Sequence, residues 1–96
     1  MSTIDIRAYH NLSHEDALTA AEELSCALAE KFDIDYGWDD EVINFERIGV
    51  HGQIFVHDKE LRIQAHLGIL LMMLKRPIEQ EIYRYLAEHF GCTFDD

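Results

Sequence analysis

Residues 53–67 read QIFVHDKELRIQAHL and decide the fold class, because a short apolar run is followed by a polar turn and then by a segment in which apolar and polar side chains alternate. Alternation with a period of two is typical of a strand with one buried face. The turn falls at Asp58-Lys59-Glu60, and the inward side chains that follow it are Leu61, Ile63, Ala65 and Leu67. The sequence therefore predicts an antiparallel hairpin that is apolar on one face and polar on the other.

Further segments extend this hairpin into a sheet. Residues 3–9 and 34–38 alternate in the same way, and the side chains expected to point inward are Ile4, Ile6, Ala8, Ile34, Tyr36 and Trp38. This placement predicts a largely buried Trp38. A return strand is expected over residues 42–48, and the two glycines of Gly49-Val50-His51-Gly52 are assigned to a turn or bulge.

Two segments show helical spacing. The first begins after Ser13, which is placed as an N-cap with acidic residues in the following turn, and it runs to about residue 32. Pro77 interrupts the second, and it predicts either a short helix to about Lys75 followed by a longer helix, or a single kinked helix. This segment starts after Gly68, and its inward side is expected to carry Leu70, Leu71, Leu74, Ile78, Ile82, Leu86 and Phe90.

The order of these elements is β-α-β-β-β-β-α. It predicts an α+β fold in two layers, a mainly antiparallel sheet with both helices on one face. Residues 1–96 contain no repeat and no linker-like segment, so a single domain with one modest core is expected.

Charge and composition limit the classes of partner. Eight Lys and Arg residues against nineteen Asp and Glu residues give a formal net charge of −11, which repels nucleic acid. The longest strongly apolar stretch, residues 67–74, is much shorter than the roughly 20 residues of a transmembrane helix. Cys26 and Cys92 lie in no paired motif and no signal peptide precedes them, so a reduced, cytoplasmic location is expected.

No motif predicts a catalytic residue, a cofactor or a metal site. The six histidines are scattered and form no HExxH pattern. His57 and His66 share the outward parity of their strands, so they either face each other across the 53–67 hairpin or, the favoured interpretation, are two solvated surface residues. Cys26 is placed as a packing residue in an apolar, acidic helix that raises the pKa of a thiol, and Cys92 in a mobile tail. We therefore expect a protein that is not an enzyme.

Strand parity and helical spacing leave six apolar residues outside the core: Val42, Ile48, Phe55, Ile69, Met72 and Met73. The first three make the open sheet face too apolar for bare solvent, which indicates a partner or ligand surface, or a homodimer. The last three lie off the main stripe of the second helical segment, where methionine suits an irregular apolar partner. Arg47 shares the parity of inward residues and is a candidate to pair with a carboxylate.

Several short blocks occur in a familiar order: His10-Asn11-Leu12-Ser13, Phe45-Glu46-Arg47, Gly49-Val50-His51-Gly52, Ala65-His66-Leu67-Gly68 and Leu74-Lys75 with Pro77-Ile78-Glu79. Together they resemble, over about residues 10–86, the polyhydroxyalkanoic acid system family, small bacterial proteins associated with the genes that make and manage intracellular polyester granules. The resemblance implies a setting in polyester or granule metabolism, and it transfers no active site.

The favoured hypothesis is a non-enzymatic accessory or granule-associated protein of polyhydroxyalkanoate metabolism, which binds a protein partner or the granule surface through exposed apolar residues. The alternative is a small-molecule carrier that holds a hydroxyacyl or fatty-acyl chain between the sheet and the C-terminal helix. An internal cavity distinguishes the two hypotheses, because only the carrier requires one.

Overall fold

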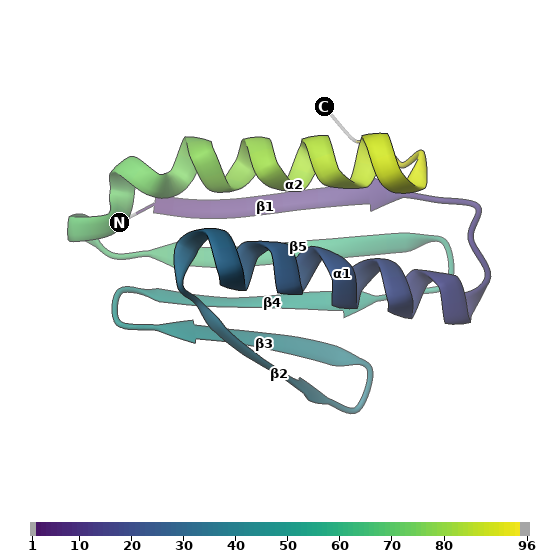
Figure 1. Ribbon diagram of the computed structural model, residues 1–96, viewed down its shortest axis with the longest axis horizontal. Coiled ribbons are helices and arrows are strands. Elements are labelled where there is room, and N and C mark those ends of the chain that lie inside the picture. Colours follow the sequence, from purple (N-terminus) through teal and green to yellow (C-terminus); the bar gives the residue numbers. More distant parts are fainter. Residues whose placement is uncertain (1, 95–96) are drawn as a thin grey trace.

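The computed structural model describes residues 2–94, and its elements follow the predicted order with one short strand added at the end (Figure 1). The strands are β1 (Ser2–Tyr9), β2 (Asp35–Asp39), β3 (Val42–Arg47), β4 (Val50–Val56), β5 (Glu60–Leu67) and β6 (Thr93–Phe94). The helices are α1 (His14–Phe32), the 3-10 helix η1 (Ile69–Leu74) and α2 (Lys75–Phe90). The predicted α+β class is confirmed.

All six strands form one antiparallel sheet in the order β2-β3-β4-β5-β1-β6. Strands β2 to β5 make a meander, and β1 pairs with β5 along its whole length. Both long helices pack on one face, where α1 contacts β2, β3 and β4 while α2 lies along β1 and touches α1 (Figure 1). The helices of residues 2–94 thus leave the opposite face of the sheet open.

Local signals fix both ends of α1. The Ser13 side chain accepts a hydrogen bond from the Asp16 amide at 3.1 Å, as expected for the predicted N-cap. At the other end Asp33 adopts the left-handed conformation (φ 57°), and its amide donates back to the last turn of the helix. The Arg47 guanidinium donates to the Phe32 carbonyl at 2.7 Å, which ties the end of β3 to a helix terminus of partial negative charge.

The expected split of the C-terminal helical segment near Pro77 is confirmed. Helix α2 begins at Lys75 and carries Pro77 in its first turn, where a backbone N–H is not needed for helical hydrogen bonding. The inward placement of Leu70 is wrong, because this side chain is 90% exposed. A 3-10 helix has three residues per turn instead of 3.6, so the side of η1 that packs on the core carries Leu71 and Leu74.

Two side chains near the edges of the sheet also differ from prediction. Trp38 has the expected parity but is 40% exposed, since β2 is an edge strand with a neighbour on one side only. Cys92 is buried, because the chain reverses at Gly91 (φ 63°) and β6 pairs with β1. The predictions of a buried Trp38 and of a mobile tail around Cys92 are therefore wrong.

Close packing of β4 against β5 depends on a glycine. Gly52 lies opposite Ala65 in mid-strand, on the covered face. A Cβ atom at Gly52 would lie 2.8 Å from the Gln64 carbonyl oxygen and 3.0 Å from the Ala65 Cβ atom. The turn or bulge assigned to Gly52 is wrong, and the turn itself is formed at Gly49, whose φ of 89° favours glycine.

We predict that Gly52→Ala destabilises the protein by about 1–3 kcal/mol, because the added methyl group overpacks a rigid strand pair. Gly37→Ala is the matched control, since a Cβ atom at that strand position meets nothing within 4 Å. Urea unfolding measures both free energies. Equal stabilities for the two variants would contradict the packing described for Gly52.

Candidate functional site

Large exposed apolar side chains gather at one end of the molecule. Five of them are between 42% and 96% exposed, and we call this group the apolar tip: Ile48, Ile69, Leu70, Met72 and Met73. The tip is formed by η1 and by the turn between β3 and β4, which lie at the same end of the sheet (Figure 1). It contains four of the six residues that sequence analysis selected as a candidate surface.

Backbone contacts hold the two parts of the tip together. The Gly68 amide donates to the Gly49 carbonyl at 2.8 Å, so the residue before η1 is bonded to the turn that carries Ile48. Leu71 packs against Gly49, where a Cβ atom would lie 3.0 Å from the Leu71 Cδ1 atom. The placement of Ile48 on the open sheet face is wrong, because β3 ends at Arg47 and Ile48 belongs to the turn.

Charge is distributed unevenly with respect to the tip. Strand pairing and the Arg47–Phe32 hydrogen bond bring residues 2–4, 29–35, 46–52 and 65–80 to this end of the molecule, and these residues include four basic and five acidic ones. The remaining residues therefore carry nearly all of the net charge of −11. Lys75 and Arg76 directly follow η1, so the apolar tip is flanked by positive charge in an otherwise acidic protein.

A buried carboxylate joins the two helices close to this end. Glu81 of α2 is only 7% exposed, and its Oε1 atom accepts from Lys31 Nζ at 3.0 Å and from Arg84 at 2.6 Å. The hydrogen bond from Arg84 is the main cause that lowers the pKa of Glu81. Both cations are thus partners of a structural anion, and we assign this cluster to helix packing.

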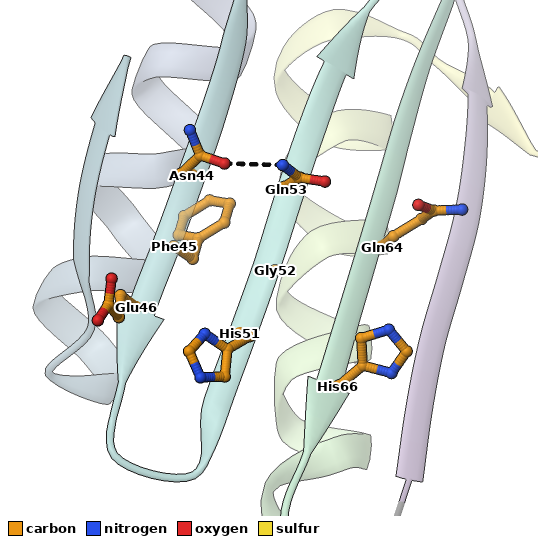
Figure 2. Close-up of a pocket in the computed structure, with 8 residues that line it drawn as sticks. All are labelled: Asn44, Phe45, Glu46, His51, Gly52, Gln53, Gln64 and His66. Atoms are coloured by element: carbon orange, nitrogen blue, oxygen red, sulfur yellow. Dashed lines mark hydrogen bonds between the residues drawn. The ribbon is translucent and has the colours of Figure 1, made fainter. Parts of the chain in front are cut away.

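The open face of the sheet is mainly polar, so the expectation that it is too apolar for solvent is wrong. A shallow hollow of about 290 Å³ lies on this face, and side chains of β3, β4 and β5 line it (Figure 2). Gln53 donates to Asn44 at 2.8 Å across two strands. The residues that line the hollow are Asn44, Phe45, Glu46, His51, Gly52, Gln53, Gln64 and His66.

The histidine pair on this face differs from the pair considered from the sequence. His66 lies opposite His51 in the register of β4 and β5, and the Thr3 hydroxyl lies 3.4 Å from His66 Nδ1. His57 lies past the end of β4, where its ring stacks on Phe55 with centroids 6.3 Å apart. His57 and His66 are both exposed, as the favoured interpretation expected, and the alternative that they face each other is wrong. The hairpin register predicts the pair His51 and His66 only if β4 is known to extend back to Val50, directly after the Gly49 turn.

Val42 and Phe55 form a small apolar region of the open face, away from the tip. They are direct cross-strand partners, and both are half-buried. The six candidate residues therefore belong to two surfaces instead of one. Arg47 points to the covered side as predicted, but its hydrogen bond goes to the Phe32 carbonyl and not to a carboxylate, so its role within residues 2–94 is structural.

The thiols and histidines of the described chain do not assemble a reactive site. Cys26 is exposed rather than packed, and desolvation together with Glu30 raises the pKa of its thiol. Burial raises the pKa of Cys92. His10 and His14 are four residues apart but have separate partners, and no group of three or more His, Cys, Asp or Glu suited to a metal ion occurs within residues 2–94.

Hydrogen bonds to Glu22 link the edge strand β2 to α1. Its two carboxylate oxygens accept hydrogen bonds from the Tyr36 hydroxyl and the Trp38 indole N–H, each at 2.6 Å. These bonds lower the pKa of Glu22, and the bond to Glu22 raises the pKa of Tyr36 to about 12. The aromatic side chains expected to be core residues are thus anchored by a helix carboxylate at the rim of the core.

The layer between sheet and helices offers little internal space. The void there measures about 20 Å³ and is lined by core residues of α1, α2 and the central strands, among them Leu28, Ile63 and Ile82. A volume of this size admits about one water molecule. Within residues 2–94, this void is too small for the acyl chain that the carrier hypothesis places there.

The protein is a small two-layer α+β protein with a mainly polar open sheet face and an exposed apolar tip. Residues 4–90 match the family described as "Putative polyhydroxyalkanoic acid system protein", so the chain belongs to this family. No curated protein and no solved structure matches the chain. No helix within residues 2–94 has both the length and the apolar character needed to cross a bilayer.

The Glu22 contacts predict a pH dependence of stability. The pKa of Glu22 is lower in the folded protein than the ordinary value of 4.5, so its contribution is present above that value and is lost as the pH falls through the lowered pKa. We predict that Glu22→Gln is less stable than the wild type at pH 7 and that the difference narrows below about pH 4.

Urea unfolding followed by the fluorescence of Trp38, the single tryptophan, measures this difference. Glu88→Gln removes one exposed carboxylate of α2 and controls for the change in net charge. A difference for Glu22→Gln that stays constant between pH 7 and pH 3 would contradict the assigned hydrogen bonds.

Proposed function

We propose that this protein is a non-enzymatic accessory protein of polyhydroxyalkanoate metabolism that attaches to the granule boundary through the apolar tip. The observation that carries the proposal is the tip itself, a cluster of large apolar side chains exposed at one end of an acidic protein. Membership of the polyhydroxyalkanoic acid system family supports the setting.

The size of the tip is sufficient for reversible attachment. Burying one apolar side chain of this size contributes roughly 1.5–3 kcal/mol. Leu70, Met73 and Ile48 are at least 81% exposed, so their full burial on a surface approaches the roughly 8 kcal/mol that corresponds to micromolar binding, before association costs. Ile69 and Met72 extend the same contact, and methionine adapts to an irregular surface.

The charges around the tip favour binding to a granule boundary that is apolar and carries anionic groups. Lys75 and Arg76 lie directly behind the tip, where they suit anionic groups at the rim of an apolar surface. The strongly acidic remainder of the molecule is repelled by the same surface, so the protein approaches with its tip foremost. A convex turn with this charge distribution suits an extended surface better than a protein groove.

We propose a non-catalytic role because the described residues include no activated nucleophile and no metal cluster. Both cysteine thiols have raised pKa values, and the carboxylates with lowered pKa values, Glu22 and Glu81, are held by structural partners. A role in attachment needs none of these groups.

We predict that the double variant Leu70→Ser with Met73→Ser binds purified polyhydroxyalkanoate granules at least about tenfold more weakly than the wild type, since it removes two of the most exposed tip residues. Sedimentation of granules with titrated protein measures the binding. Stability should be unchanged because neither side chain contributes to the core.

Tyr9→Ser is the matched control, because it removes an exposed aromatic side chain at the end of β1 that lies away from the tip. It should retain granule binding. If both variants bind as tightly as the wild type, the tip is not the attachment surface. If both lose binding equally, exposed apolar surface acts non-specifically and the proposal is wrong.

A further inference from the structure

The open face of the sheet has a charge pattern that runs across the strands. On β1 and β5 the outward side chains include Arg7 and Arg62 together with Asp5 and Glu60, so this flank is neutral, and Arg62 is paired with Asp5 at 3.1 Å. The acidic side of the face lies on β2 and β3, where the outward residues include Asp35, Asp39 and Glu46. Strand β4 lies midway between the two sides, with two long strands on each flank.

Cross-strand register places these charges in matching positions. One row of outward residues runs across the sheet through direct partners, in the order Arg7, Arg62, Phe55, Val42 and Asp39. Arg7 and Asp39 thus lie at the same level along the strands, each two strands from β4 but on opposite sides. Arg7 forms no ion pair with any residue that the structure describes.

We infer that the open face binds a second copy of this chain, face to face, about a two-fold axis that runs parallel to the strands along β4. Such an axis exchanges the two flanks of the sheet and keeps the level along the strands. It places Arg7 of each copy over Asp39 of the other, and it does so twice because the contact is isologous. Phe55 then meets Phe55 of the partner copy on the axis.

The other two rows fit the same axis. In the row nearest the tip, His66 and Glu46 lie one strand to either side of His51, so each His66 meets Glu46 of the other copy. In the middle row, Gln64 and Asn44 flank β4 in the same way and can exchange amide hydrogen bonds. The polar hollow of Figure 2 is thus lined by groups that complement their own copies.

Other pairings of two copies bring like charges together. An axis in the same face but perpendicular to the strands places Asp35 of each copy over Asp39 of the other. Antiparallel pairing of the edge strands β2 also sets Asp35 opposite Asp39, twice, around Gly37. Like charges on an edge strand repel each other when two copies pair, so they disfavour edge-to-edge association.

The contact is expected to be weak and sensitive to salt. Five long strands about 4.8 Å apart, with about seven residues of 3.3 Å each, give a face of roughly 24 by 23 Å, which is at the small end of specific interfaces. Its apolar centre is Phe55 on the axis, Val42 beside it lies over Arg62 of the other copy, and most other contacts are charged or amide groups. Facing sheets cross at about −30°, an offset that the long Arg7 side chain can span.

The inferred geometry has a consequence for the proposed granule attachment. An axis parallel to the strands leaves both apolar tips at the same end of the dimer. Two tips on one side allow simultaneous attachment to one surface, and linked sites of this kind bind more tightly than either alone. The inference itself rests on the sheet face and does not require the granule proposal to be correct.

A charge-reversal experiment tests the inference without granules. Arg7→Glu and Asp39→Arg each turn two attractive contacts of the dimer into two repulsive ones. A mixture of the two variants restores both contacts, because Glu at position 7 then meets Arg at position 39 and the native Asp39 meets the native Arg7. Arg76→Glu is the matched control, since it makes the same charge change on the helix layer.

Sedimentation velocity at about 200 µM protein and about 50 mM salt should show a wild-type dimer that dissociates at about 500 mM salt. Each single variant should weaken the dimer about tenfold or more, the mixture should recover it, and Arg76→Glu should behave as the wild type. Phe55→Glu, which places two carboxylates on the axis of its own dimer, should be monomeric.

A monomeric wild type under these conditions would overturn the inference. So would single variants that still form dimers, or a mixture that stays monomeric. All charge variants are at exposed positions, and thermal melting confirms that each is folded before its association is interpreted. A failed granule assay with an intact, charge-swappable dimer would instead reject the granule proposal alone.

Discussion

The antiparallel register between β4 and β5 is the constraint on which the rest of the structure depends. It sets Ile54 opposite Ile63 on the covered face and Phe55 opposite Arg62 on the open face. A shift by one residue would exchange the two faces and expose the core. Gly52 allows this close pairing, because a side chain there would collide with the neighbouring strand. The covered face then binds both helices, and the open face keeps its polar rows.

Both proposed surfaces are consequences of this arrangement. The sheet ends abruptly at Leu67, and the chain passes through a 3-10 turn before α2 can pack on β1, so the apolar side chains of that turn project past the core. The open face keeps ordered rows of charge because each strand contributes one outward residue per level. The apolar tip thus offers one end for the proposed attachment, and the open face offers one side for the proposed association.

Alternation and capping signals predicted most of the fold from sequence. Ser13 caps α1 and both helices cover one face as expected. The failures have physical causes that a single sequence does not reveal. Trp38 has the correct parity, but the edge position of β2 depends on strand order. Leu70 was misplaced by assuming 3.6 residues per turn. Ile48 was misplaced by assigning one residue too many to β3. The complementary rows of the open face require the exact register of five strands.

The position of the tip at the granule can be observed directly by moving the single tryptophan of the chain. In a protein that carries Trp38→Phe with Leu70→Trp, the account predicts that granule binding shifts the emission to the blue and protects the indole from acrylamide quenching. The native protein, whose tryptophan lies on the edge strand β2, should show neither change on binding. A tip tryptophan that remains accessible to acrylamide on bound granules, while Trp38 of the native protein becomes protected, would contradict the account.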